Sequence, residues 1–581
     1  MNKFQSKTNI KNFNTIFNLS FNKEYKKKFY VTFILMMSGM ILELCGIGLI
    51  FPALQIITDQ EFLIKVSKIF GIPNLEISNL LIFISIFFIL FYGLKNFFLW
   101  IILRKYASFL AYYEAYLQSK IYNGYFKKSV YYFKHKNSSD IIVNIKEICS
   151  FFSSIYLNSL INLSLEIFLQ ISILLLLFFF NWQSTLLILI LFGGLSVFLF
   201  SYHKNRLKEL GQLRNELSKL QLRNVQDGIG GIKEIKLLGR ELFFLKEFEN
   251  NTKQLADANR ENAVIAGTPR LVIEFFAICS VATMIILFLF LGKSILEILP
   301  TLGLFFVAAY KMIPSFNKIL LLLTRVKFSS DGVNKILNLL NEIKFDKDLN
   351  DTKASQEIKF EKEINLSKIS YKYPDRGYQI LKDVNMKINK NTFVGISGES
   401  GSGKSTLIDI IMGIIRPNEG QILIDGVSID VSIRDWQKKI GYVSQDIFLF
   451  PDTIRKNVAF GLPENEIDDK LLDEVIRKSS LQKFIDSLEN GLNTNIGEGG
   501  ALISGGQKQR IGIARALYNK PKLLIFDEAT SALDISTEKE ILNEIINLKK
   551  EFTLIFVSHK ENSLKYCDKK YLLKNKILTE N

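Results

Sequence analysis

Six long apolar stretches in the first 325 residues constrain the fold of this chain more than any other feature. A helix needs about 20 apolar residues to cross about 30 Å of hydrocarbon, and no comparable stretch follows residue 325. The stretches span residues 30–55, 79–103, 157–181, 184–202, 266–292 and 299–323. They predict a six-helix transmembrane domain at 30–325, preceded by a cytoplasmic segment at 1–29. The first stretch starts too late and runs too long to be a signal peptide.

The basic residues set the expected orientation of these helices. The chain has 73 Lys and Arg residues against 57 Asp and Glu residues, a formal net charge of +16. The long connections after the second and fourth stretches are rich in Lys and Arg, whereas the alternate connections carry only Lys65, Lys68 and Lys293. Basic loops stay on the cytoplasmic side, so we expect both termini in the cytoplasm. The positive charge is then mostly a topology signal, which argues against nucleic acid as a partner.

The two long basic connections are expected to be helical extensions of the spans. Residues 203–262 continue the fourth and fifth stretches and are broken at Asp227–Gly231, because glycine is a poor helix former. Residues 133–147 offer a similar break around Asn137–Ser139. A short helix near 61–70 is expected in the first outer loop.

The composition changes after the last apolar stretch. Residues 341–363 are charged and low in apolar residues, which is typical of a linker. Short apolar runs then alternate with helical patterns, which indicates an α/β domain. We therefore predict a linker at 326–360 and an α/β domain at 361–581.

A phosphate-binding loop lies near the start of this domain. Residues 398–405 fit the pattern G-x-x-x-x-G-K-S, follow the apolar run 393–396 and open a helical pattern at 406–412. Backbone N–H groups of such a loop surround phosphates, and the helix N-terminus adds a favourable dipole. The expected nucleotide contacts come from Gly398, Ser400, Gly401, Gly403, Lys404, Ser405 and Thr406. Lys404 would reach the outer phosphates, and Ser405 would ligate Mg²⁺.

Two adjacent acids end a later apolar strand. Residues 523–526 are apolar and run into Asp527 and Glu528. Facing a phosphate site, the two carboxylates have separate roles: Asp527 would hold Mg²⁺, and Glu528 would polarise the attacking water.

Between these motifs, Ile503-Ser504-Gly505-Gly506-Gln507 resembles the signature motif of ABC transporters, with Ile in place of the usual Leu. The other motifs of that family follow in order. Tyr373 resembles the A-loop aromatic that stacks on adenine, with Tyr371 as the weaker candidate, and Gln445 resembles the Q-loop glutamine and metal ligand. Thr494–Gly500 with Glu498 resembles the X-loop of exporters, Ser531–Asp534 the D-loop, and His559 the switch histidine.

The resemblance covers the whole chain and implies a mechanism. The fold would be a membrane all-α six-helix domain with long cytoplasmic helical extensions, followed by an α/β P-loop ABC ATPase domain. ATP would be held between Lys404 of one chain and Ser504 of another. Intact Glu528 and His559 imply a homodimer, with a heterodimer as the alternative. The breaks near 137 and 229 would be coupling helices that link ATP-driven closure to the membrane helices.

Charged residues in or at the edges of the apolar stretches point to what is carried, since each is costly in a membrane unless it is paired or faces water. They are Glu43, Lys95, Glu166, Arg270, Glu274, Lys311 and Lys318. One interpretation is internal pairing, for example of Arg270 with Glu274, four residues apart, or of Glu43 with Lys95. The other is a polar path with basic groups for an anionic headgroup.

A closer resemblance favours the second interpretation. Thr268-Pro269-Arg270, the stretch Tyr310–Asn317 and the loop Gly230–Lys236 are similar to the bacterial lipid-linked oligosaccharide flippase of protein N-glycosylation. This resemblance implies a multi-pass protein of the bacterial inner membrane, with Lys95, Arg270 and Lys311 as substrate contacts. Export of another amphiphile (a lipid, drug or peptide) remains an alternative. So does a non-transporting channel or regulator, which the intact Glu528 and His559 disfavour.

Overall fold

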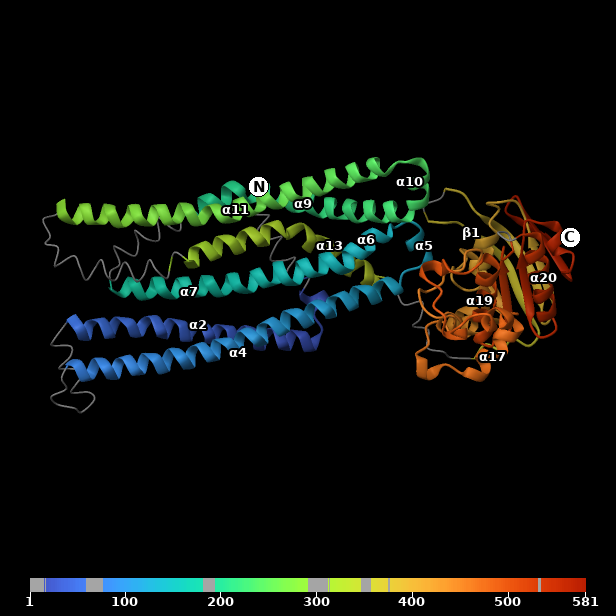
Figure 1. The fold of residues 1–581 in the computed structure, drawn as a ribbon, viewed down its shortest axis with the longest axis horizontal. Helices are drawn as coiled ribbons and strands as arrows, with labels where there is room; N and C mark the ends of the chain where they lie inside the picture. The colour runs from blue at the N-terminus through green and yellow to red at the C-terminus, as the bar shows by residue number, and fades with distance from the viewer. Residues whose placement is uncertain are drawn as a thin grey trace. The chain divides into compact units, whose positions relative to one another are not determined.

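The computed structural model describes residues 15, 17–58, 77–180, 194–290, 312, 314–345, 357–374, 377–530 and 534–580. The chain divides into two compact units, Met1–Asp346 and Lys347–Asn581 (Figure 1). The first unit is helical and the second is α/β, as the sequence predicts.

Long helices build the first unit. They are α2 (Lys23–Thr58), α4 (Ile77–Phe126), α7 (Asn158–Phe180), α9 (Gly194–Gly230) and α11 (Glu241–Phe290). Helix α2 lies against α4, and α9 lies against α11 (Figure 1). Three helical segments in the described residues are long and apolar enough to cross a membrane, at 23–46, 85–126 and 138–175.

These segments overlap the first three predicted spans. The fifth predicted span lies in α11 as far as Phe290, and the end of the fourth lies in α9. The remainder of the fourth span and most of the sixth fall outside the described residues, as does the helix expected near 61–70. The helical class is therefore confirmed, whereas the count of six stays a prediction.

The predicted breaks in the helical extensions are present. Helix α9 ends at Gly230, the short helix α10 (Ile232–Leu238) follows, and α11 begins at Glu241. Gly239 closes α10 with φ +61°, a left-handed conformation that glycine adopts without steric cost. In the other connection, α4 stops at Phe126, and α5 (Val130–Lys134) and α6 (Ser138–Val143) follow. Two π-helical turns, Asn144–Ile148 and Phe151–Leu157, then lead into α7.

The predicted linker begins later than expected. Residues Ser330–Phe345 form helix α13, which belongs to the first unit. Ile336, Leu339 and Leu340 are buried at the i, i+3, i+4 spacing of one helix face and join the core around Tyr113. The abundance of Asn, Lys and Asp on the opposite face made this segment resemble a linker, although its apolar stripe is sufficient for a packed helix.

Two sheets build the second unit. The strands are β1 (Glu363–Tyr371), β2 (Leu381–Asn389), β3 (Phe393–Ser397), β4 (Glu419–Ile424), β5 (Val427–Ser428), β6 (Ile440–Val443), β7 (Leu523–Asp527), β8 (Thr553–Val557), β9 (Lys569–Lys574) and β10 (Ile577–Glu580). One sheet is antiparallel in the order β2-β1-β4-β5. The other has the order β10-β9-β3-β8-β7-β6, and all its pairs are parallel except β9 with β10.

Seven α-helices accompany these sheets in the described part of the second unit. They are α14 (Lys404–Ile411), α15 (Ile433–Lys438), α16 (Ile454–Val458), α17 (Asp469–Lys478), α18 (Gln482–Asp486), α19 (Gly505–Tyr518) and α20 (Ile535–Leu548). Every residue of β7 and β8 is buried, as expected for central parallel strands covered on both faces. Because β3, β7 and β8 are parallel neighbours, the segments that follow them meet at one edge of the sheet.

Candidate functional site

The phosphate-binding loop connects β3 to α14 with the geometry that its glycines require. Gly403 has φ +108° and caps α14, and a Cβ there would lie 2.9 Å from Ile380 Cγ2. A Cβ on Gly398 would lie 2.5 Å from the Leu573 carbonyl oxygen. Lys404 is buried and its Nζ donates to the carbonyl oxygens of Gly398, at 2.9 Å, and Glu399, at 3.1 Å. The loop is thus closed around its own lysine.

Three segments bring polar side chains to this loop. Glu528 follows β7, and its carboxylate lies 3.7 Å from Lys404 Nζ. Gln445, two residues after β6, donates from Nε2 to Glu528 Oε2 at 3.2 Å. His559, two residues after β8, has Nδ1 3.8 Å from the same oxygen. The sequence-predicted residues Lys404, Gln445, Glu528 and His559 therefore form one cluster.

The backbone at Glu528 is strained. Its φ is +49°, in the left-handed region that non-glycine residues rarely occupy. A hydrogen bond from Glu528 N to the Val557 carbonyl oxygen, at 3.1 Å, holds this conformation. Such strain persists where the surroundings impose it and concentrates at functional sites.

The second acid, Asp527, is buried beside Glu528. Burial and the neighbouring Glu528 charge raise the pKa of Asp527 above its usual range. The Tyr442 hydroxyl lies 3.3 Å from Asp527 Oδ2 and donates to it, and burial together with the Asp527 charge raises the pKa of Tyr442. Tyr442 was not predicted from the sequence, although its place in β6, just before Gln445, was available as a signal.

The donor set suits Mg²⁺ bound to a nucleotide. This cation takes one or two carboxylates, hydroxyl oxygens and waters, and phosphates supply the remaining ligands. Asp527, Ser405 and Gln445 offer oxygens of these kinds, and burial followed by the Glu528 charge raises the pKa of Asp527, an unfavourable setting for its carboxylate that a cation would offset. On the loop itself, Ser402 Oγ is buried and has no hydrogen-bond partner within the described residues, so it is a further hydroxyl that a phosphate would satisfy.

The aromatic residues near the loop form two groups. Tyr373 is buried, with its hydroxyl 3.1 Å from Thr406 Oγ1 and its ring centroid 5.0 Å from that of Tyr371. Tyr378 is 54% exposed and lines a pocket of about 370 Å³ together with Gly401 and Lys576. The structure therefore adds Tyr378 as a second aromatic beside the phosphate loop, a position that no sequence motif marked.

The signature residues form a helix N-terminus. Ser504 caps α19 and accepts a hydrogen bond from Gln507 N, and Gln507 Oε1 accepts one from Ser504 N at 2.8 Å. Gly506 is buried, and a Cβ there would lie 2.8 Å from Thr537 Cγ2, whereas Ser504 and Gly505 are exposed. The hydrogen bonds of this cap stay within the signature segment, and its free N–H groups are available to an anion.

The predicted D-loop is described only at its end. Asp534 caps α20 by accepting a hydrogen bond from Thr537 N at 3.1 Å, and the hydroxyl of Ser536 lowers the pKa of Asp534 most strongly. The residues at 531–533 lie outside the described part of the chain. In the predicted X-loop, Glu498 opens a single 3₁₀ turn, Glu498–Gly500.

The three cations predicted to contact substrate, Lys95, Arg270 and Lys311, differ in their surroundings. Lys95 is 8% exposed, and its Nζ lies 4.4 Å from the ring centroid of Tyr92, whose hydroxyl donates to the carbonyl oxygen of Gly46 on α2. Arg270 is 72% exposed and donates from Nε to Glu274 Oε1 at 2.8 Å. Lys311 lies outside the described residues.

The pairing interpretation is confirmed for two pairs of these charges. Arg270 pairs with Glu274, as the four-residue spacing suggested. Glu166 is buried on α7, where Lys318 Nζ lies 2.5 Å from Oε1 and Ser315 Oγ donates to Oε2 at 2.9 Å. The pair of Glu43 with Lys95 stays a prediction.

Comparison with known proteins agrees with this geometry. Residues 381–531 match the family described as ABC transporter, and residues 47–309 match the family described as ABC transporter transmembrane region. The ATP-dependent lipid A-core flippase of Cupriavidus pinatubonensis is 28% identical over 454 residues, which are 75% of this chain and 74% of that protein. An uncharacterized ABC transporter ATP-binding protein of Bacillus subtilis is 29% identical over 413 residues, 69% of each chain.

The fold also has a close counterpart among solved structures. A bacterial Atm1-family ABC exporter with ATP bound superposes with a TM-score of 0.75 at 20% identity, covering 96% of this chain and 95% of that one. Fold and site together define a membrane transporter driven by an ATP-hydrolysing domain. The chain belongs to the ABC transporters with fused transmembrane and ATP-binding domains, and it is an exporter-type transport ATPase.

Proposed function

We propose that this chain is an ATP-driven flippase that moves a lipid-linked oligosaccharide, or a related glycolipid, from the cytoplasmic to the outer leaflet of a bacterial inner membrane. It works as a homodimer by alternating access. The observation that carries the proposal is a complete catalytic cluster in a chain whose apolar helices hold cationic side chains. Such cations are costly in a membrane unless they pair or serve an anionic group.

The relatives support a lipid substrate. Two proteins that match 75% of this chain are named ATP-dependent lipid A-core flippases. The resemblance of the stretch around Arg270 to lipid-linked oligosaccharide flippases points in the same direction. A glycan with a phosphate linkage combines an apolar tail with an anionic head, so it needs both a lipid-exposed path and cationic contacts.

The catalytic roles follow from the positions of the side chains. Lys404 donates to two loop carbonyl oxygens and exchanges these bonds for phosphate oxygens when a nucleotide enters. Glu528 orients and polarises the attacking water, and Gln445 and His559 hold its carboxylate from two sides. Ser405, Gln445 and Asp527 would hold Mg²⁺, which when bound neutralises charge on the phosphates. Catalysis is then mainly positioning and charge stabilisation.

Two copies are needed because the signature cap forms its hydrogen bonds within its own segment and none with the phosphate-binding loop of the same chain, among the described residues. Ser504 and Gln507 bond to each other, so the exposed N-terminus of α19 remains available to a nucleotide held by a second chain. Identical chains then give two complete sites. Crosslinking of a Ser504→Cys chain to a phosphate-loop cysteine in a second chain, in the presence of ATP, would support the homodimer; crosslinks confined to one chain would oppose it.

The test of the substrate uses purified protein in lipid nanodiscs. We expect polyprenyl-pyrophosphate oligosaccharide to stimulate ATP hydrolysis, with the Glu528→Gln protein as the background. Stimulation by apolar drugs or simple phospholipids, without a response to the glycolipid, would instead favour a general amphiphile exporter. ATP-independent ion conductance in planar bilayers would favour the channel alternative.

The contribution of Arg270 can be tested in the same assay. Arg270→Gln is expected to abolish the stimulation by the glycolipid, because the cation that attracts the pyrophosphate is removed. Arg260→Gln on the same helix is a matched control, since Arg260 is also exposed and pairs with an acid one turn away, Asp257. Lys95→Gln is expected to weaken stimulation as well; unfolding of that variant would instead assign Lys95 to packing against α2.

A further inference from the structure

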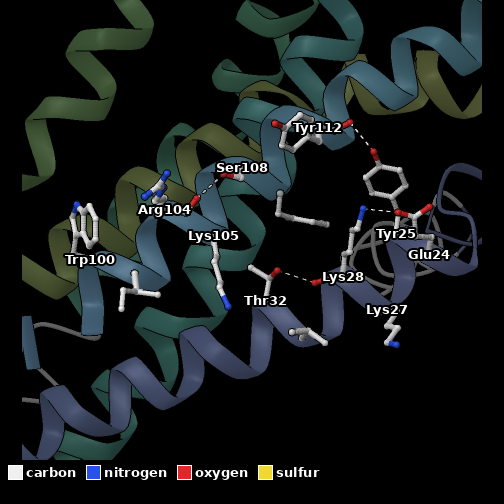
Figure 2. Close-up of a pocket in the computed structure, with 13 residues that line it drawn as sticks. Glu24, Tyr25, Lys27, Lys28, Thr32, Trp100, Arg104, Lys105, Ser108 and Tyr112 are labelled. Carbon is white, nitrogen blue, oxygen red and sulfur yellow. Dashed lines mark hydrogen bonds and ion pairs between the residues drawn. The ribbon is translucent and has the colours of Figure 1, made fainter. Parts of the chain in front are cut away.

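A pocket of about 880 Å³ opens between the start of α2 and the middle of α4 (Figure 2). Lys27 and Val31 line it from α2, and Trp100, Arg104 and Lys105 line it from α4. Neither the catalytic cluster nor any motif of the sequence includes this pocket.

The pocket lies where two apolar spans end. On α2, Lys27 precedes the apolar run that begins at residue 30, and on α4 Trp100 lies in the last turn of the apolar run, which ends at Leu103 just before Arg104 and Lys105. Cations and Trp at such ends are typical of the boundary between hydrocarbon and water. The basic ends of these spans are expected on the cytoplasmic side, so the pocket faces the headgroups of the cytoplasmic leaflet.

The charge of the pocket is not balanced by acids. Its one carboxylate, Glu24, pairs with Lys28 at 2.5 Å. Lys27, Arg104 and Lys105 form no ion pair within the part of the chain that the structure describes. The Arg104 guanidinium lies 5.9 Å from the centroid of the Trp100 ring. Three cations therefore line the pocket without an ion pair to an acid in the described residues.

Apolar surface continues from the cations along both helices. Lys27, Val31 and Ile34 share one face of α2 at the i, i+4, i+7 spacing, and Val31 and Ile34 are 50% and 66% exposed. On α4, Phe97 is 60% exposed and its ring stacks on Trp100 at 6.0 Å. A ligand of this pocket thus meets cations at one end and exposed apolar side chains at the other.

We propose that this pocket binds an anionic phospholipid of the cytoplasmic leaflet. Lys105, which reaches from α4 toward α2 (Figure 2), contacts its phosphate, Lys27 and Arg104 attract its headgroup from the two helices, and its acyl chains run along the apolar faces that carry Val31 and Phe97. The lipid thereby contacts both α2 and α4. The proposal does not depend on which substrate is transported.

Trp100 provides a direct reporter for the test. Trp182→Phe removes one of the other two tryptophans, and Trp436 is fully buried in the second unit, beyond the reach of lipids. The protein is reconstituted in phosphatidylcholine that contains equal mole fractions of brominated phosphatidylglycerol or brominated phosphatidylcholine. We expect stronger quenching of Trp100 by the anionic lipid, because each surface cation adds about 1 kcal/mol of attraction.

Two variants sharpen this test. Arg104→Gln with Lys105→Gln should lower the preference for phosphatidylglycerol on the order of tenfold. Arg104→Lys with Lys105→Arg should retain it, which separates loss of charge from misfolding. Arg223→Gln with Lys246→Gln removes the same charge from exposed positions of α9 and α11 and should also retain the preference.

Three results would overturn the proposal. Equal quenching by the two brominated lipids would mean that the cations select no headgroup. Absence of quenching by either lipid would mean that a second copy or another segment covers the pocket. Loss of the preference on addition of polyprenyl-pyrophosphate oligosaccharide would assign the pocket to the transported substrate instead of a resident lipid.

Discussion

The two units hold their charged side chains in opposite ways. In the ATPase unit, Lys404, Gln445 and His559 lie around the carboxylate of Glu528, although all four residues are distant in sequence. In the helical unit, Arg270 pairs within its own helix and Glu166 pairs with Lys318 at a separate position. Parallel strands deliver their ends to one edge within a single chain, whereas helices present their charges at separate positions along their length.

This difference shows which part of the function depends on short sequence motifs and which part depends on helix packing. The strand ends bring the catalytic cluster together within one chain, and short sequence motifs are sufficient to find it. A substrate path between helices depends on which faces meet, so the same residue, Arg270, can be an internal pair or a ligand contact. The predictions below test this contrast, beginning with the largest expected effect.

The largest effect is expected at the centre of the ATPase cluster. Glu528→Gln should lower ATP hydrolysis by about 100-fold or more, because the neutral amide cannot polarise the attacking water. Steady-state phosphate release measures this, with Glu540→Gln as the control, since Glu540 is exposed on α20. A Glu528→Gln protein that retained near-normal turnover would move the catalytic base elsewhere in the cluster.

Substitution of the two tyrosines beside the phosphate loop should affect ATP binding to different degrees. Tyr373→Ala should raise the KM for ATP about tenfold by removing a stacking partner for adenine. Tyr378→Ala should change it less, because Tyr378 lines a separate pocket with Gly401 and Lys576 that includes neither Tyr373 nor Thr406. If Tyr378→Ala had the larger effect, the exposed ring would be the one that stacks on the base, and the family resemblance at Tyr373 would mislead.

In the helical unit, removal of Lys318 should destabilise the fold. Lys318→Leu leaves the buried Glu166 carboxylate with Ser315 and without its cation, at a cost of about 1–3 kcal/mol after allowance for the half-exposed lysine. Thermal unfolding in nanodiscs measures the loss, and a Glu166→Leu, Lys318→Leu double variant should recover part of it. Arg270→Gln, at a fully exposed pair, should shift the unfolding temperature far less.

The smallest effect concerns the stability of the ATPase cluster without ligand. Because the pKa of Asp527 is raised in the folded state, the folded protein binds more protons than the unfolded chain between the two pKa values. Stability should therefore fall as pH rises through that window, and the cost persists at neutral pH. Asp527→Asn should raise the unfolding temperature of the nucleotide-free protein and lower ATP hydrolysis.

The same variant has a clear contradicting outcome. If Asp527→Asn lowered the unfolding temperature without nucleotide, the carboxylate would contribute to the fold through Tyr442 more than it costs. Addition of Mg²⁺ and ATP should reverse the order of stabilities, because the wild-type carboxylate then gains a cation. Equal stabilisation of both proteins by the ligand would exclude Asp527 as a metal contact.

The sequence predicts the ATPase cluster better than the membrane path for a physical reason. Lys404 and Glu528 each stand in a local pattern of strand, turn and helix that fixes their side chains. Tyr442 and Tyr378 were missed because only the pairing of β6 with β7, and the fold of the segment before β2, bring them to the site. Helix α13 was missed because its polar residues outnumber the narrow stripe around Ile336.

In the helical unit, the sequence predicts the helices but not the contacts between them. Apolar length predicts α2 and α4 without any knowledge of contacts, yet it carries no information about which faces meet. The partner of Glu166 is Lys318, 152 positions further along the chain, and no local spacing predicts this pair. In the sequence, the cations of the pocket between α2 and α4 indicate membrane topology alone, and only the structure shows that they line one pocket.

The cap of α19 has a consequence for repeated binding and release of nucleotide. A serine hydroxyl carries one proton to donate and two lone pairs to accept with. Ser504 uses one lone pair for Gln507 N, so its proton remains available to a phosphate oxygen. A nucleotide can therefore dock on this helix end and depart without any bond of the cap being broken. Because nucleotide binding breaks no hydrogen bond of the cap, none has to be re-formed when the nucleotide leaves, so release is as direct as binding.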